Sequence, residues 1–343
     1  MGITLQDIAK RARVSVASVS IALNNKQGVG AAKRQAILKI ARELGYEFEP
    51  PRAEQATRRG TIRFIKIIKS GHVLNRDHDI FISDYINGIE QEAPHHGYNL
   101  EIRSFQQAAI DHVVDTIDNS ELKGAIILGT ELDHRDLQPF EALRIPVVAL
   151  DTYYDFLQLD FVDMNNIDAM YNIVSHLYQQ GHRDIGLVTS TIITRNFQLR
   201  RDGLTTALEH FGLPFRQERV FAVDSTFQGA YTDMAALLAQ GVSLPPALFI
   251  SNDIMAYGCI KAIKEAGLAV PADVSVIGFD DLPTSAVMEP PLTTYAVSKI
   301  RMGEIAFRIL EERIESRPDM PSMKVSISGR LVIRGSVRQA PPA

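Results

Sequence analysis

The chain of 343 residues contains a single cysteine, Cys259. One cysteine excludes a disulfide framework and any cysteine-only metal cluster. No apolar run reaches the roughly 18 residues that a membrane span needs. Residues 1–7 also lack the basic stretch and apolar core of a secretory signal. We therefore expect a cytoplasmic protein that has no membrane partner.

The composition and charge indicate a globular protein with a distinct N-terminal part. Hydrophobic residues make up 45% of the chain and charged residues 22%, as in ordinary globular domains. The net charge of −5 hides an asymmetry, because residues 1–60 carry eleven basic and five acidic side chains, a balance of +6. The remainder is therefore strongly acidic. A basic head on an acidic body indicates an anionic partner for the head, although a solvated charged face would show the same balance.

The first 46 residues read as three short helices without a strand. Thr4 is followed three residues later by Asp7, as in a capping box, and apolar residues then recur at helical spacing. Ser15 can cap a second helix that runs to Asn24, and a third helix is predicted near 31–44. Two helices joined by a short turn predict a helix-turn-helix, whose second helix can enter a DNA major groove.

The order of residues in this head is more specific than the helical pattern. It contains Thr4-Leu5-Gln6-Asp7-Ile8-Ala9, Val14-Ser15, Val19-Ser20, Leu23-Asn24 and Ala41-Arg42-Glu43-Leu44-Gly45-Tyr46. This order resembles the head of the LacI/GalR family of bacterial transcription regulators. The resemblance implies double-stranded operator DNA as a partner.

The resemblance also implies two sets of DNA contacts. Val16, Ala17 and Ile21 match base-reading positions, and because all three are apolar they can pack on thymine methyl groups but cannot form a bidentate guanine contact. The implied phosphate contacts, which set register, are Thr4, Ser15, Ser18, Ser20 and Asn24. Core packing of Ile21 and simple helix capping by Ser15 are alternatives, and Val19 and Leu23 are the better core candidates.

Residues 47–60 contain two prolines and a basic end, which is typical of a linker. In the family this stretch forms a hinge helix on DNA, and a leucine wedges into the minor groove. No leucine lies between Tyr46 and Ile62. Ala53 and Ala56 could face the groove, but neither is a good wedge. We expect a hinge that DNA orders, and intercalation stays open.

From residue 61 onward, apolar runs alternate with amphipathic segments. Strands are predicted at 62–68, 100–105, 125–128, 146–150, 185–189, 247–250 and 274–279. Helices are predicted near 81–96, 110–120, 166–180, 197–211, 229–240, 253–266 and 299–315. Alternating strands and helices predict parallel sheets with helices on both faces. The body is large for one such sheet, so we expect two lobes.

The family resemblance continues through the body. Its motifs are Gly181-His182-Arg183-Asp184-Ile185, Ser251-Asn252-Asp253-Ile254-Met255-Ala256, the stretch from Val270 to Asp281, and Pro290-Pro291-Leu292-Thr293-Thr294. The implied fold is an all-α helix-turn-helix head followed by an α/β body of two doubly wound parallel-sheet lobes, similar to a periplasmic binding protein.

The resemblance implies three segments: 1–46 for the DNA-binding domain, 47–60 for the hinge and 61–343 for the effector-binding and dimerisation domain. The first lobe is expected at about 61–161 plus 293–323, and the second at about 163–290 plus 326–340. The chain would then cross between the lobes near 161–163, 290–293 and 323–326.

A ligand in such a fold lies beyond the carboxyl ends of the strands. The resemblance implies effector contacts from Asp151, Arg200, Asn252 and Asp280, a set of donors and acceptors that suits a polyhydroxylated ligand. Capping roles for Asn252 and Asp280 and a surface position for Arg200 are alternatives. Phe81 could stack on a sugar face or pack in the core.

One departure from the family concerns the loop at 69–79, which is several residues longer than usual and would lie at the cleft mouth. Its His72 could contact an acidic or extended effector, or the loop could be a solvated insertion. A second departure is Val297-Ser298, where the family often has Gln-Pro.

These features predict a DNA-binding regulator of transcription, a repressor controlled by a sugar or sugar derivative. We expect a homodimer, with a tetramer left open, and no cofactor. The alternatives are a solute-binding protein and a sugar-active enzyme with a similar body and no role on DNA. The helical head and the missing export signal disfavour the first. The sequence contains no phosphate-cradling glycine loop, nucleophile elbow or paired-histidine metal motif, which disfavours the second.

Overall fold

The computed structural model describes residues 3–23, 29–44, 46, 59–118, 120–315 and 320–340. The chain divides into two compact units, and the main boundary along the sequence falls between Arg59 and Gly60. Within the described part of the chain, no helix combines the length and apolar character that a membrane crossing requires.

The first unit is a bundle of three helices: α1 (Leu5–Ala12), α2 (Val16–Leu23) and α3 (Ala31–Glu43). The Asp7 carboxylate accepts hydrogen bonds from the backbone N–H and the hydroxyl of Thr4, at 2.9 and 2.7 Å. Ser15 Oγ accepts from the Ser18 N–H at 3.1 Å, so its predicted cap on α2 is confirmed.

A small apolar core holds these three helices together. Its buried members are Ile8, Ala9, Val19, Ala22, Leu23, Ile37 and Ala41. Both residues predicted to lie in the core, Val19 and Leu23, are among them. The face of α2 that begins at Val16 is left toward solvent.

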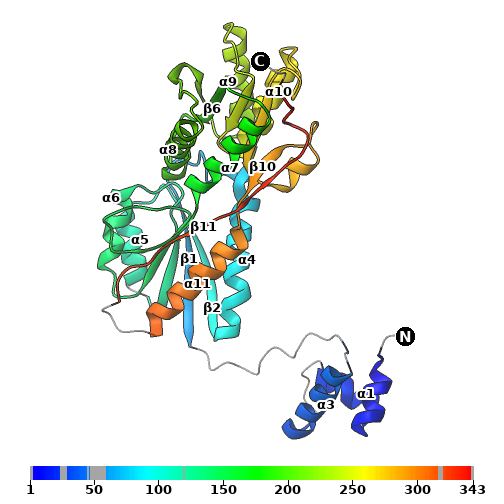
Figure 1. Cartoon of the computed structure of the whole chain (residues 1–343). Coiled ribbons are helices and arrows are strands. Elements are labelled where there is room, and N and C mark those ends of the chain that lie inside the picture. The colour runs from blue at the N-terminus through cyan, green and yellow to red at the C-terminus, as the bar shows by residue number, and fades with distance from the viewer. Residues whose placement is uncertain are drawn as a thin grey trace. The chain divides into compact units, whose positions relative to one another are not determined.

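The second unit contains two six-stranded sheets, each the centre of a lobe (Figure 1). The first lobe has the strand order β11 (Lys324–Ile327), β5 (Asp160–Met164), β4 (Val147–Leu150), β3 (Leu122–Leu128), β1 (Gly60–Ile68) and β2 (Tyr98–Gln106). Its helices are α4 (Asp79–Glu92), α5 (Ile110–Asp118), α6 (His134–Leu137) and α11 (Lys299–Glu315).

The second lobe repeats this design. Its strand order is β12 (Arg330–Val332), β10 (Thr293–Ala296), β9 (Ser275–Asp280), β8 (Ala247–Ile250), β6 (Ile185–Ser190) and β7 (Val220–Val223). Its helices are α7 (Asn166–Gln179), α8 (Arg195–His210), α9 (Phe227–Ala239) and α10 (Asp253–Glu265). Strand β12 runs antiparallel to β10, whereas β10 pairs with β9, and β8 with both β6 and β9, in parallel.

The predicted strands and helices of the body are all present. The central strands are buried apolar runs, such as β8, in which all four residues are fully buried. Such runs are typical of parallel sheets that are covered on both faces.

The sequence interpretation missed five strands: β5, β7, β10, β11 and β12. Each has five residues or fewer, and polar residues interrupt the apolar pattern in all of them except β7.

The chain crosses between the lobes three times, and each crossing lies later than expected. Strand β5 stays in the first sheet as far as Met164. Strand β10 still pairs in the second sheet, so the expected crossing at 290–293 is wrong and the chain leaves that lobe after Ala296. Strand β11 pairs with β5 through Ile327 before β12 joins the second sheet. Pro290 and Pro291 precede β10, because proline suits the start of a strand better than its interior.

Helices α4 and α11 pack closely in the first lobe and so place the cleft residues that α4 carries. A Cβ atom on Gly303 would lie 2.1 Å from the carbonyl oxygen of Tyr85, which only a glycine avoids. This approach brings Lys299, at the start of α11, to 5.1 Å from the ring centroid of Phe81 on α4.

Candidate functional site

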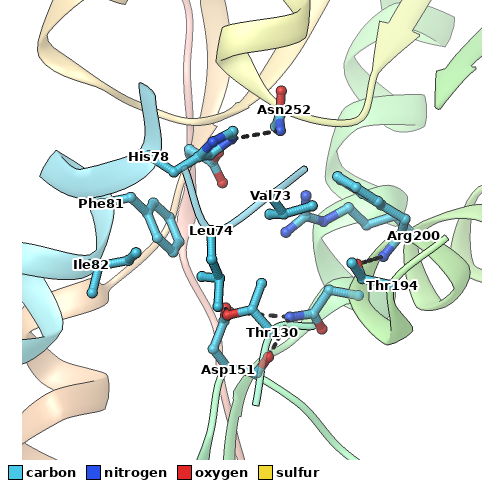
Figure 2. A pocket seen from close by; sticks show the side chains of 13 residues that line it. Val73, Leu74, His78, Phe81, Ile82, Thr130, Asp151, Thr194, Arg200 and Asn252 are labelled. Atoms are coloured by element: carbon cyan, nitrogen blue, oxygen red, sulfur yellow. Dashed lines mark hydrogen bonds between the residues drawn. The ribbon is translucent and has the colours of Figure 1, made fainter. Parts of the chain in front are cut away.

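A cavity lies where the carboxyl ends of the two sheets' strands face each other (Figure 2). The space not filled by atoms there is about 420 Å³ when the open solvent at its mouth is counted. Its lining residues are Val73, Leu74, His78, Phe81, Ile82, Thr130, Asp151, Thr194, Asn196, Phe197, Arg200, Asn252 and Asp280. The strand order of each sheet reverses between β1 and β3 and between β6 and β8. Such switch points are where doubly wound sheets bind ligands.

Asp151 follows β4 and is the centre of a buried hydrogen-bond network. Its carboxylate accepts from the hydroxyls of Tyr85, at 2.9 Å, and of Thr130. Asn196, from α8 of the other lobe, donates to the Asp151 carboxylate at 3.1 Å and to its carbonyl at 3.0 Å. Burial raises the pKa of Asp151 to about 6, although the bonds from Thr130 and Tyr85 act in the opposite direction. This network therefore connects the two lobes.

Arg200 is held by its neighbours as firmly as a core side chain. Its guanidinium donates to Asn166 Oδ1 at 3.0 Å, to the carbonyl of Ser251 at 2.5 Å and to the sulfur of Met164 at 3.0 Å. It also lies over the ring of Phe279, 3.7 Å from the centroid. A guanidinium has five N–H donors, so these bonds leave part of its capacity for a ligand.

Asp280 ends β9, and its carboxylate accepts no hydrogen bond from any residue that the structure describes. Lys299 instead donates to the Asp280 backbone carbonyl at 2.8 Å. Burial raises the pKa of Asp280 well above its ordinary value, against the opposing charges of Arg200 and Lys299. A buried carboxyl group without partners is costly unless something donates to it. Asp280 therefore offers a ligand a carboxyl group that no described residue has engaged.

His78 and Asn252 connect the lobes on another side of the cavity. The His78 Nε2 and Asn252 Nδ2 atoms are 3.0 Å apart, and Asn252 Oδ1 accepts from the Met255 N–H at 2.8 Å. Because the amide nitrogen can only donate, Nε2 must be the acceptor and His78 must be neutral. Burial agrees with this, since it lowers the pKa of His78 to about 4. Asn252 thus both caps α10 and lines the cavity.

Apolar side chains form the rest of the wall. Phe81 meets Tyr85 edge to face, with 5.2 Å between the ring centroids, and only 7% of its surface is exposed. It is packed in the core and still lines the cavity, so both predicted roles are available to it. Figure 2 shows Leu74, Phe81 and Ile82 on the first-lobe side. The cavity combines a polar edge with an apolar wall.

The comparisons with known proteins give the family. Residues 4–48 match the bacterial regulatory proteins of the lacI family, and residues 174–337 match a periplasmic binding protein-like domain. The repressor CytR of Escherichia coli K12 is 32% identical over 98% of this chain and 97% of its own length. The chain belongs to the lacI family of bacterial regulatory proteins. It is a DNA-binding transcriptional regulator with an effector-binding body.

Other relatives agree with this assignment. The repressor PurR of Glaesserella parasuis serovar 5 is 30% identical over 98% of each chain. The regulator CelR in complex with cellobiose shares the fold, with a TM-score of 0.72, 22% identity and coverage of 97% of this chain and 99% of that one. The lac repressor dimer bound to operator has a TM-score of 0.71 at 24% identity, over 98% and 100% of the chains.

In the head of this lacI-family regulator, the residues matched to base reading lie toward solvent or partly buried on α2. Val16 is 40% exposed and Ala17 is also exposed, whereas Ile21 is half-buried. The residues matched to phosphate contacts that the structure describes are Thr4, Ser15, Ser18 and Ser20, each exposed or half-buried. Asn24, Ala53 and Ala56 lie outside the described residues.

In the body, five of the six predicted effector residues line the cavity: Phe81, Asp151, Arg200, Asn252 and Asp280. His72 does not, because its Nδ1 atom points to Asp224 of the second lobe at 3.1 Å. The sequence interpretation missed Thr130, Thr194 and Asn196. Each follows a strand that was predicted, so the rule that ligands lie beyond strand ends could have found them. Among the described residues, no group of three or more His, Cys, Asp or Glu could hold a metal ion.

Proposed function

We propose that this regulator is a cytoplasmic, homodimeric repressor that does not turn over its ligand. Its segments would be the head at 1–46, the hinge at 47–60 and the body from 61 onward. The head would bind double-stranded operator DNA, and a sugar or sugar derivative in the cavity would set operator affinity. The names of the relatives, two repressors and an operator-bound dimer, support this reading.

The observation that carries the ligand class is that the unengaged carboxyl group of Asp280 and the apolar side chain of Phe81 line the same cavity. A sugar ring has hydroxyl donors along its edge and an apolar C–H face, which fit these two sides. An anionic ligand fits less well, because it would lie beside the carboxyl groups of Asp151 and Asp280, and bonds to Asn166 and Ser251 already take part of the donor capacity of Arg200. Cellobiose and ribose, which occur in structures of similar fold, belong to the expected class.

A thermal-shift screen of the full chain tests the ligand class. The compounds are monosaccharides, disaccharides, nucleosides and sugar acids at equal concentration. A ligand that binds only the folded state raises the free energy of unfolding by mass action, by about 2.7 kcal/mol when its concentration is a hundred times Kd. The melting temperature rises with it. We expect neutral sugars or nucleosides to raise the melting temperature and to be recovered chemically unchanged. Stabilisation by sugar acids alone, or conversion of the ligand, would contradict the proposal.

Truncation tests the proposal that the head binds operator DNA. Removing residues 1–60 should abolish operator binding and leave the ligand-induced shift in melting temperature intact, because the cavity lies wholly in the second unit. The dimer is tested by sedimentation of the operator complex. A monomer on a single half-site would refute it, since two-fold symmetric proteins match two-fold symmetric operators.

A further inference from the structure

The long loop after β1, residues 69–78, is held in one shape by the first lobe. Glu131, which follows β3, accepts hydrogen bonds from five backbone N–H groups of this loop at 2.9 to 3.2 Å. The donors are Lys69, Ser70, Gly71, Val73 and Leu74. Burial would raise the pKa of Glu131, but these backbone bonds outweigh burial and hold the pKa below its usual value. Bonds to a charged acceptor are the stronger kind, so the loop is anchored rather than free.

The same loop contacts the second lobe at the start of α9. His72 Nδ1 lies 3.1 Å from Asp224 Oδ2, and the hydroxyl of Ser225 donates to the His72 carbonyl at 2.5 Å. The N–H of Phe227 donates to the Asp77 carboxylate at 3.1 Å. Phe227 is the first residue of α9, so its N–H has no partner within the helix. An acidic side chain from the other lobe supplies that partner, as the positive end of the helix favours.

The loop also forms part of the cavity wall, through Val73, Leu74 and His78. Val73 and Leu74 are 7% and 3% exposed, so they are packed in place rather than splayed into solvent. Their N–H groups are the ones that bond to Glu131. The contacts that fix the loop to one lobe thus also fix a wall of the cavity.

We propose that residues 69–78 form a strap that fastens the two lobes across the cleft and controls entry to the cavity. Glu131 anchors the strap on the first lobe, and Asp224, Ser225 and Phe227 receive it on the second. A ligand enters when the strap leaves α9, and strap and ligand together hold the cleft closed. The entry role rests on the proposed function of the cavity, whereas the fastening does not.

Amide hydrogen exchange on the ligand-free full chain tests the fastening. In Asp77→Ala, the Phe227 amide loses its acceptor and should exchange roughly two- to tenfold faster, the effect of one net hydrogen bond. The Gly229 amide, which donates to Thr226 within the second lobe, should not change. Asp79→Ala is the matched control, since Asp79 pairs with Lys66 of its own lobe. Equal Phe227 exchange in all three proteins would overturn the proposal.

Glu131→Gln tests whether loosening the strap on the first lobe also weakens its contact with the second lobe. It should speed exchange of the amides at 70–74 and also that of Phe227, although the hydrogen bonds of Glu131 within the described part of the chain all go to the strap and not to α9. Glu121→Gln, at an exposed site, is its control. Faster exchange confined to 70–74 would mean that the loop is anchored but fastens nothing.

Entry is tested with a cysteine inside the cavity. Ile82 lines the cavity and is 4% exposed, so Ile82→Cys reports access to iodoacetamide. Peptide mass separates its modification from that of the buried Cys259. Adding Asp77→Ala should speed the labelling severalfold, and adding Asp79→Ala should not. Equal rates would refute control of entry. None of these assays uses a sugar or DNA, so their failure is distinct from failure of the proposed function.

Discussion

Asp163 gives the sharpest test of the electrostatics near the cleft. It is the last residue but one of β5, beside the first crossing between the lobes. It is 1% exposed, and its Oδ1 atom has no hydrogen-bond partner within the described residues. Burial and the nearby charge of Asp151 together raise the pKa of Asp163 to about 8, although bonds from Met164 and Asn196 act against both. Asp163 therefore carries a proton in the folded protein at neutral pH.

The sign of the pH dependence follows from the two pKa values. The unfolded group has the ordinary pKa of 3.8 and the folded group one of about 8. The folded state thus binds one more proton between these values, and the free energy of unfolding falls as pH rises. The slope is about 1.4 kcal/mol per pH unit. Asp163→Asn cannot ionise, so between pH 5 and pH 7 the wild type should lose about 3 kcal/mol relative to the variant.

Urea unfolding followed by circular dichroism at pH 5, 6 and 7 measures this difference. Protein concentration is held constant, because dissociation of a dimer contributes to apparent stability. Asp111→Asn, at an exposed site on α5, is the control and should follow the wild-type curve. Parallel curves for the wild type and Asp163→Asn would show that Asp163 is ionised in the fold and would refute the reasoning.

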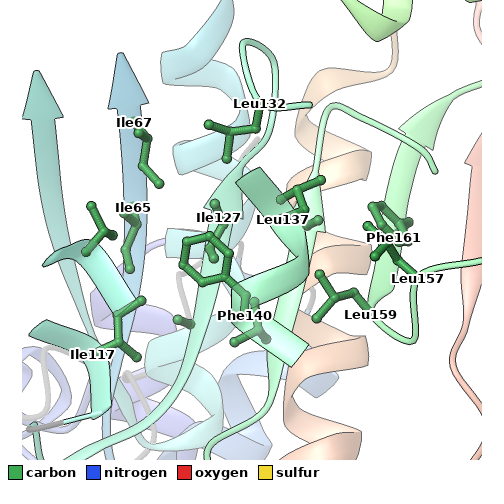
Figure 3. Packing of buried hydrophobic residues seen from close by; sticks show 14 of the residues in the cluster. Ile65, Ile67, Ile117, Ile127, Leu132, Leu137, Phe140, Leu157, Leu159 and Phe161 are labelled. Carbon is green, nitrogen blue, oxygen red and sulfur yellow. The ribbon is translucent and has the colours of Figure 1, made fainter. Parts of the chain in front are cut away.

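Three further predictions concern the ligand, the core and the DNA. Asp280→Ala should weaken sugar binding in calorimetry at least tenfold and leave operator binding intact, whereas Asp202→Ala on the exposed face of α8 should change neither affinity. Phe140 is 1% exposed and lies in the first-lobe core that Figure 3 shows. Phe140→Ala should lower the free energy of unfolding, measured by urea titration, by about 3–5 kcal/mol. A much smaller loss would mean that the core around it collapses into the gap. Operator affinity should fall roughly a thousandfold between 50 and 200 mM salt in fluorescence anisotropy, because the basic head acts through phosphates. A salt-independent affinity would contradict a phosphate-based contact.

Residues and their spacing were enough to predict the helical head and the alternation of strands and helices in the body. Ser15 as a cap and Val19 as a core residue followed from local rules, since capping and helical periodicity act within a few residues. The cavity residues Asp151 and Asp280 were implied by the family resemblance. Their positions agree with a general rule, since each ends or follows a strand and parallel strands bring their carboxyl ends to one edge.

The tertiary structure decided what depends on segments far apart in the chain. His72 was expected in the cavity, but it meets Asp224, which lies 152 residues away in the other lobe. Arg200 was expected to serve a ligand, yet its bonds to Asn166 and Ser251 also make it a structural residue. No local pattern contains such pairings. They arise only when three chain crossings bring the carboxyl ends of the two sheets together. Burial there then sets which polar groups find partners and which, like Asp280, stay open.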